Sequence, residues 1–203
     1  MDVRVAVLAS GTGSNLQALL DDPTVGPAIA LVVSDRPEAA ALERARARGV
    51  SAVALTPAGY ESREAFDRGL LDVLEEAGID VVLLAGYMLI IGPVVVRAFP
   101  DRMLNVHPSL LPAFPGAHPV RDALEWGARV TGVTVHLVDE EVDHGPIVLQ
   151  EAVAIEPGDD EDSLHRRIQD VEHRIYPHAA RLLGEGKLKV EGRRVHVLAE
   201  EGR

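Results

Sequence analysis

The first half of the chain alternates short apolar runs with longer segments rich in arginine, glutamate and alanine, and this alternation limits the fold more than any other feature. An apolar run of a few residues fits a buried strand, whereas apolar residues at helical spacing among charged ones fit a helix. Strands that alternate with helices are typical of consecutive βαβ units on a parallel sheet. We therefore expect an α/β fold with a mostly parallel, twisted sheet and flanking helices.

The predicted elements of this half follow one another through short connections. Strands are expected at 5–9, 29–33, 53–55, 81–85 and 102–106. Helices are expected at 16–21, in an alanine-rich segment that ends at Arg48, and at 61–77. Glycines follow the last two helices and favour their ends. The uncharged stretch 81–96 is shorter than the ~20 residues that cross a bilayer and contains two glycines and a proline, so it is interpreted as buried core.

After residue 100 the pattern changes. Prolines recur between 108 and 119, which excludes a helix interior or a central strand and predicts a long ordered loop. Strands are expected at 133–138 and 147–155, around an acidic loop. Asp160 is placed to cap a helix over 161–176 that ends near Pro177, and 188–197 predicts a terminal hairpin around Gly192.

Composition excludes several classes of function. The chain has 203 residues, 47% of them apolar, which suffices for one compact domain with a substantial core. Its formal net charge of −12 would repel a polyanion, so we expect no nucleic-acid partner. Without cysteine there is no disulfide, thiol nucleophile or cysteine-ligated metal, and we expect no metal site. No signal peptide or membrane span is evident, so a cytoplasmic protein with no membrane partner is expected.

The loop after the first strand, 10–15, carries Gly11 and Gly13 at a strand-to-helix turn. Backbone N–H groups in such a turn can hold a phosphate, helped by the positive end of the helix. Leu16 stands where a dinucleotide fingerprint has its third glycine, and no lysine follows as in a nucleoside triphosphate loop. The loop therefore fits a small phosphate monoester, or the glycines merely permit a tight turn.

Asn105 and His107 stand at the carboxyl end of the fifth predicted strand, the edge where open α/β sheets bind ligands. Positions i and i+2 of a strand point to the same side, so an amide and an imidazole would face one cavity and could stabilise an oxyanion. The alternative is a structural histidine among the eight in the chain. Asp143, in an acidic stretch that is otherwise a solvated face, would favour the charged imidazolium if it lay beside His107.

Further motifs accompany these residues at 62–64, 84–88, 105–112, 134–136 and 169–173. Together they closely resemble the folate-dependent phosphoribosylglycinamide formyltransferases of purine biosynthesis, over nearly the whole chain. The resemblance implies one formyltransferase domain over 1–203, with a phosphate-binding half at about 1–100 and a catalytic and folate half at about 101–203. It implies transfer of the formyl group of 10-formyltetrahydrofolate to the amine of glycinamide ribonucleotide, with small-molecule partners and a homodimer left open.

The resemblance also implies roles for individual residues. Asn105 and His107 would stabilise the oxyanion, His107 would protonate the departing folate nitrogen, and Asp143 would keep the histidine charged. The ribonucleotide would contact Gly13, Ser14, Asn15, Gln169, Asp170, Val171 and Glu172. The folate would contact Arg63, Met88, Leu89, Ile90, Ile91, Asn105, Asp139, Glu140, Glu141, Val142 and Asp143. Leu89 replaces an arginine common in the family, and His144 replaces a small residue.

Three competing functions are weighed against this one. A methionyl-tRNA formyltransferase would carry a further carboxyl-terminal RNA-binding domain, and a formyltetrahydrofolate hydrolase would carry a further amino-terminal domain. A non-catalytic sensor of phosphorylated metabolites would not need the asparagine, histidine and aspartate together. The sequence therefore favours the ribonucleotide formyltransferase.

Overall fold

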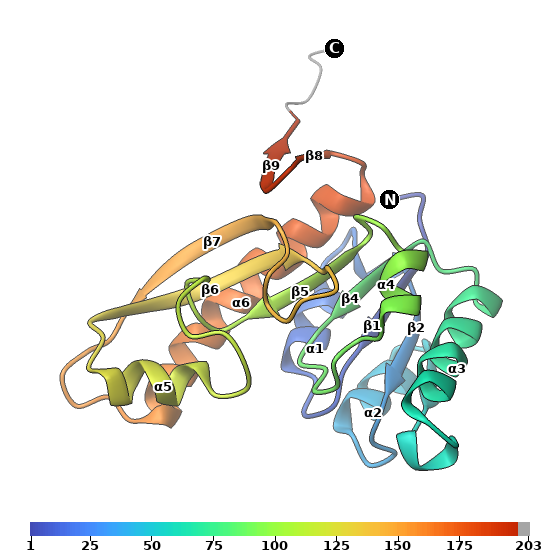
Figure 1. Ribbon diagram of the computed structural model, residues 1–203, viewed down its shortest axis with the longest axis horizontal. Coiled ribbons are helices and arrows are strands. Elements are labelled where there is room, and N and C mark those ends of the chain that lie inside the picture. The colour runs from blue at the N-terminus through green and yellow to red at the C-terminus, as the bar shows by residue number, and fades with distance from the viewer. Residues whose placement is uncertain (199–203) are drawn as a thin grey trace.

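A computed structural model describes residues 1–198 and contains one mixed sheet flanked by helices (Figure 1). The described strands are β1 (Val5–Leu8), β2 (Ile29–Ser34), β3 (Ser51–Ala54), β4 (Val81–Leu84), β5 (Met103–His107), β6 (Val130–Leu137), β7 (Ile147–Ala154), β8 (Leu188–Glu191) and β9 (Arg194–Val197). The α-helices are α1 (Ser14–Asp21), α2 (Ala40–Ala47), α3 (Arg63–Glu76), α4 (Pro93–Ala98), α5 (Pro119–Trp126) and α6 (Glu161–Gly184). Short 3₁₀ turns lie at Gly26–Ala28 and Pro57–Gly59.

The sheet has the order β3-β2-β1-β4-β5-β6-β7-β9-β8 in the described residues. Strands β1 to β5 pair in parallel, as the βαβ pattern predicts. Strand β6 then runs antiparallel to both β5 and β7. The terminal hairpin β8–β9 joins this sheet through one parallel pair, Ile147 with Arg194. The prediction of an α/β fold with a mostly parallel sheet and a carboxyl-terminal hairpin is confirmed.

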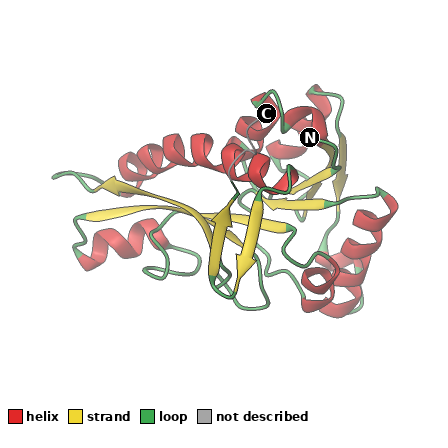
Figure 2. Cartoon of the chain, turned by 90° about the horizontal axis from the view of Figure 1, so that it is seen from above, coloured by secondary structure: helices red, strands yellow, loops and turns green. Residues whose placement is uncertain are grey.

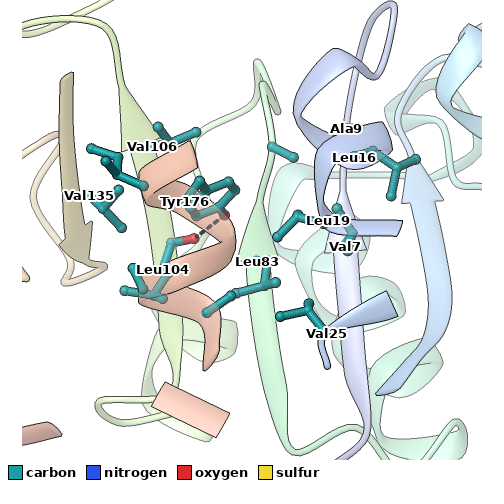
Figure 3. Close-up of a cluster of buried hydrophobic side chains, with 14 of the residues drawn as sticks. Val7, Ala9, Leu16, Leu19, Val25, Leu83, Leu104, Val106, Val135 and Tyr176 are labelled. Carbon is teal, nitrogen blue, oxygen red and sulfur yellow. Dashed lines mark hydrogen bonds between the residues drawn. The ribbon is translucent and has the colours of Figure 1, made fainter. Parts of the chain in front are cut away.

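Helices cover both faces of the sheet, as the view in Figure 2 shows. Alternate residues of β1 therefore enter two cores: Val5 and Val7 pack with α1, α2 and α6, while Ala6 and Leu8 pack with α3 and α4. Both sets are fully buried, which explains why β1 is a continuous apolar run rather than an alternating one. Figure 3 shows part of the first core, where Tyr176 of α6 meets Leu83 and Leu104.

The last helix is longer than predicted, because Pro177 does not end it. Helix α6 begins at the predicted cap, where Asp160 and Ser163 bond reciprocally, but it continues to Gly184. The proline removes one backbone donor, yet Ala179, Ala180 and Leu182 beyond it are buried against the core. We attribute the continuation to this packing, which outweighs the missing hydrogen bond.

Two short helices also lie where none was predicted. Helix α4 begins with Pro93 and occupies part of the stretch interpreted only as buried core, and α5 begins with Pro119 at the end of the predicted loop. Proline is well suited to the first position of a helix, where its missing N–H is not needed. Both prolines mark helix starts rather than loop alone.

The loop between β5 and α5 is long and ordered, as predicted. Thr134 of β6 holds it through two bonds, accepting from the Leu111 N–H at 3.0 Å and donating to the Ser109 carbonyl at 2.7 Å. Gln150 of β7 donates to the Leu111 carbonyl at 2.8 Å. The antiparallel half of the sheet thus fixes a loop that begins directly after His107.

Strand order reverses between β1 and β4, since the chain moves outward from β1 to β3 and then returns to the other side of β1. At such a point the loops after two neighbouring parallel strands diverge and leave a crevice at the carboxyl edge. The predicted phosphate loop follows β1, and His107 ends β5, the next strand beyond β4. The topology therefore brings both candidate groups to one edge.

Candidate active site

A cleft of about 680 Å³ opens at this edge of the sheet. Its walls come from the loops after β1, β4 and β5, from the acidic loop after β6 and from α6. Of the predicted site residues, it is lined by Gly13, Ser14, Asn15, Met88, Leu89, Ile90, Ile91, Asn105, His107, Asp139, Glu140, Glu141, Val142, Asp143, Gln169 and Glu172.

Three predicted site residues do not line the cleft. Arg63 lies in the first turn of α3, where its Nε is 3.1 and 3.0 Å from the two carboxylate oxygens of Asp67. Asp170 and Val171 follow Gln169 on α6, and Val171 packs against the core. Successive residues of a helix point about 100° apart. Gln169 and Glu172 therefore share the helix face that meets the cleft, while the two residues between them point away from it.

The loop after β1 has the backbone geometry of an anion cradle. Gly13 precedes α1 with φ +73°, and a Cβ there would lie 2.9 Å from the Ala41 Cα, so only glycine fits. Arg44 donates to the Thr12 carbonyl at 2.8 Å, and the Ala41 N–H bonds the Gly11 carbonyl. These contacts turn carbonyls away from the cleft and leave the first N–H groups of α1 for a ligand.

Glu172 faces this cradle from α6. Its carboxylate accepts a hydrogen bond of 2.8 Å from Asn15 Nδ2, across 157 positions of sequence. Only 5% of the residue is exposed, and burial raises the pKa of the Glu172 carboxyl to about 7, against the opposing effect of the Asn15 bond. Near neutral pH the group can therefore exist in either form, and it can meet a hydroxyl donor as a carboxylate.

Asn105, His107 and Asp143 converge deeper in the cleft. Asp143 Oδ1 lies 3.5 Å from Asn105 Nδ2, and Asp143 Oδ2 lies 3.5 Å from His107 Nδ1. His107 Nε2 lies 2.9 Å from the Phe114 carbonyl, so this nitrogen carries a proton and donates it. Both ring nitrogens of His107 thus face oxygen acceptors, an arrangement that suits the doubly protonated ring.

The backbone around Asp143 is strained in a way that aims its side chain inward. Asp143 has φ +53°, a left-handed conformation that aspartate tolerates better than most residues but that still costs energy. The turned backbone leaves the side chain 9% exposed, with Oδ2 accepting the Gly116 N–H at 2.8 Å. The acidic loop and the proline-rich loop are therefore joined at the site through this carboxylate.

His136 is a site residue to which sequence reasoning assigned no role. It stands directly opposite Asn105 in the β5–β6 ladder, and its Nε2 lies 3.1 Å from Asn105 Nδ2. Its Nδ1 donates to the Leu137 carbonyl, so Nε2 is the accepting nitrogen of a neutral ring. Burial lowers the pKa of His136 and maintains that form. The strand pairing that reveals this contact could not be read from the motif alone.

The cleft combines apolar and acidic surface. Three apolar side chains are exposed around it: Met88 by 61%, Ile90 by 63% and Val142 by 54%. Exposed apolar residues that lie together are typical of a ligand-binding surface. Leu89 is half-buried and packs on the core beside α3 and α4. This position can therefore contact a ligand through its backbone but not through a charged side chain. Among the described residues that line the cleft, none is lysine or arginine. An anion held here would depend on backbone N–H groups.

Within 1–198, no group of three or more histidine, cysteine, aspartate or glutamate side chains is arranged to hold a metal ion. No helix in the same range has the length and apolar character that crossing a membrane requires.

Comparison with known proteins adds an independent finding. The formyl transferase family model matches residues 3–180. The crystal structure of glycinamide ribonucleotide transformylase 1 from Symbiobacterium toebii is 52% identical, with a TM-score of 0.94, over 97% of this chain and 94% of that one. The phosphoribosylglycinamide formyltransferase of Escherichia coli is 42% identical over 191 residues, which are 93% of this chain and 90% of the relative.

Some relatives are much longer. The trifunctional purine biosynthetic protein adenosine-3 of Homo sapiens is 44% identical over 190 residues, which are 92% of this chain and 19% of the relative. The chain therefore spans about a fifth of the length of that protein and corresponds to one part of it.

Proposed function

Since this chain belongs to the formyl transferases, and among them to the phosphoribosylglycinamide formyltransferase family, we propose that its cleft transfers a formyl group from 10-formyltetrahydrofolate to the amine of glycinamide ribonucleotide. The folate supplies an electrophilic formyl carbon bonded to nitrogen. In the reaction that carbon gains a bond to the amine and loses its bond to the folate nitrogen, while one proton passes from the amine to that nitrogen. Both substrates are small molecules, and the reaction belongs to purine biosynthesis.

The convergence of Asn105, His107 and Asp143 beside the Gly13 turn is the observation that carries this proposal. The phosphate of the ribonucleotide binds the N–H groups that begin α1, and Glu172 accepts from a ribose hydroxyl. That arrangement directs the amine toward β5. The apolar wall at Met88, Ile90 and Val142 suits the flat rings of a folate.

Asn105 and His107 stabilise negative charge on the formyl oxygen as the amine attacks. One N–H of Asn105 engages His136, and the second has only the Asp143 oxygen at 3.5 Å, so it is free to turn to the substrate. Donors fixed in place before the reaction favour the transition state over the ground state. His136 supports this by holding the amide in its orientation.

His107 also supplies the proton that the departing folate nitrogen needs. The Nε2 proton is committed to the Phe114 carbonyl, whereas Nδ1 faces Asp143 at 3.5 Å, longer than a good hydrogen bond. We assign the transferred proton to Nδ1. Asp143 balances the charge of the ring and fixes the direction in which Nδ1 points.

A single assay separates this function from its competitors. Purified protein is mixed with 10-formyltetrahydrofolate, with and without glycinamide ribonucleotide, and formation of tetrahydrofolate is followed by absorbance. Product that requires the ribonucleotide supports the proposal. Equal product without it would indicate a hydrolase, and binding of the ribonucleotide without product would indicate a sensor.

A further inference from the structure

The loop 139–144, which carries Asp143 and lines the cleft, is bound by arginines from two other elements. Arg97 of α4 donates from Nε and Nη2 to the two carboxylate oxygens of Glu140, at 2.7 and 3.0 Å. Arg193, in the turn between β8 and β9, donates from Nη2 to the His144 carbonyl at 2.6 Å and contacts His144 Nε2 at 3.1 Å. The terminal hairpin thus reaches the loop that carries a proposed catalytic group.

His144 connects this arginine to the start of the same loop. Its Nδ1 lies 2.7 Å from Asp139 Oδ2. A guanidinium cannot accept a hydrogen bond, so His144 Nε2 accepts from Arg193, while Nδ1 donates to the carboxylate. The neutral ring with its proton on Nδ1 satisfies both contacts. The His144 side chain, at the end of the loop, therefore contacts Asp139 at its beginning and Arg193 in the hairpin.

The loop has reason to need such contacts. Four of its six residues are acidic, and they repel one another within a short segment. Asp143 also holds an unfavourable φ of +53°, which persists only where the surroundings fix it. Arg193 opposes both effects by adding a positive charge and binding the backbone next to Asp143. The family model match ends at residue 180, so this contact comes from a segment outside it.

We propose that Arg193 is a positioning residue for the folate side of the cleft. It acts through His144 to hold the loop in the conformation in which Asp143 faces His107 and Val142 extends the apolar wall. The inference rests on the proposed function, because the affected substrate is the folate. The polar contacts of Arg193 in the described residues all go to His144, whereas the ribonucleotide side is built from α1 and α6, so we expect that side to be little affected by Arg193.

The test compares Arg193→Ala with Arg194→Ala. Arg194 is the next residue in the hairpin, is exposed, and has no side-chain polar contact among the described residues, so its loss removes the same charge and spares the loop. We expect Arg193→Ala to raise the KM for 10-formyltetrahydrofolate about three- to ten-fold, with the KM for the ribonucleotide within two-fold of wild type. Arg194→Ala should leave both values within two-fold.

Two further variants distinguish positioning from general support of the fold. Arg193→Lys retains a donor for the His144 carbonyl but cannot bind ring and carbonyl together, so an intermediate KM is expected. The double variant His144→Ala/Arg193→Ala should have a folate KM less than two-fold above that of Arg193→Ala alone, because both changes break the same connection. A folate KM that is the same in Arg193→Ala and Arg194→Ala, or full additivity in the double variant, would overturn the inference.

Hydrogen–deuterium exchange of the peptide covering 139–144 keeps this test independent of catalysis. Exchange should be faster in Arg193→Ala than in wild type or Arg194→Ala, with no change in the peptide covering 11–17. If the wild-type protein transfers no formyl group, the proposed function fails while the exchange still tests the contact. Unchanged exchange in Arg193→Ala would refute the positioning role even in an active enzyme.

Discussion

We propose that catalysis depends on two side chains of β5, and removing either should lower turnover strongly with little effect on folding. Asn105→Ala and His107→Ala each remove one donor to the developing oxyanion. Loss of such a donor costs about a hundred-fold or more in turnover. Steady-state rates should show this loss, while calorimetric titration should show that the ribonucleotide still binds, because its phosphate is held by the N–H groups that begin α1.

The control for these variants is His178→Ala, which removes an exposed histidine of α6 that does not line the cleft. It should retain wild-type turnover. Wild-type rates from Asn105→Ala or His107→Ala would remove that residue from the mechanism, and loss of ribonucleotide binding would show that the substitution damaged the site as a whole.

Glu172 makes stability depend on pH in a direction unusual for a carboxyl group. Burial raises its pKa from about 4.5 to about 7, so between these values the folded chain binds more protons than the unfolded chain. The free energy of unfolding therefore falls as pH rises through this window, by a few kcal/mol. Glu172→Gln cannot titrate, so it should gain stability relative to wild type from pH 5 to pH 8.

Urea denaturation of both proteins at several pH values measures this difference. Glu38→Gln serves as the matched control, because Glu38 is exposed and has no polar side-chain contact among the described residues. Its stability curve should run parallel to that of wild type. If the Glu172→Gln curve also ran parallel to wild type, the carboxyl would titrate alike in the folded and unfolded chains.

At the scale of residues, sequence reasoning located the groups that local geometry controls. The i, i+2 spacing of Asn105 and His107 on one strand was enough to place both in one cleft. It did not find His136, because its contact depends on the register between β5 and β6. It placed Asp170 and Val171 in the site by treating 169–172 as a block, although only one face of a helix meets the cleft.

At the scale of elements, Tyr176 connects α6 to the middle of the sheet. Its buried hydroxyl donates to the carbonyls of Leu84 and Leu104, at 2.8 and 3.2 Å, and Figure 3 shows the second of these bonds. Tyr176→Phe leaves both carbonyls without this donor and should lower the free energy of unfolding by about 1–2 kcal/mol. Denaturant titration measures the change.

Tyr87→Phe is the matched control. The Tyr87 hydroxyl is buried and has no hydrogen-bond partner in the described structure, and burial raises its pKa. Removing it should leave stability within about 0.5 kcal/mol of wild type or increase it, because an unpaired buried hydroxyl is unfavourable. Equal losses from both tyrosines would mean that ring packing, and not the Tyr176 bonds, holds α6 in place.

The order of the elements was predictable because the spacing of apolar residues differs between the strands and the helices of the first half. Buried parallel strands are apolar on both faces, whereas the helices are apolar on one. The α-helices that were missed or cut short all involve proline, whereas other predicted elements differ by up to three residues at their ends. Pro93 and Pro119 begin helices, and Pro177 lies within one. Proline usually interrupts regular structure, but it is tolerated at the first position of a helix, as in α4 and α5. Within α6 it is tolerated because the residues beyond it pack against distant segments, and a local sequence pattern does not predict that packing.

At the scale of the whole molecule, both halves of the chain contribute walls of the cleft, and they also pair through β4 and β5. The first half contributes the anion cradle after β1 and the apolar wall after β4, while the second half contributes β5, the acidic loop and α6. Asn15 and Glu172 join the halves directly. A site assembled in this way requires the complete sheet, which explains why its motifs are scattered along the sequence.

The charge of the whole molecule predicts how the reaction responds to salt. The chain carries −12, the described lining of the cleft lacks lysine and arginine, and both proposed substrates are anions. The long-range field therefore opposes their approach, and short-range N–H groups hold the phosphate. Raising ionic strength shortens the Debye length to about 10 Å at 0.1 M and screens this repulsion.

We expect kcat/KM for the ribonucleotide to rise about two-fold between 20 and 200 mM potassium acetate. Sulfate at equal ionic strength should instead inhibit, because it competes for the cradle. A several-fold fall in acetate would mean that cations attract the substrate and that the backbone cradle does not explain its binding.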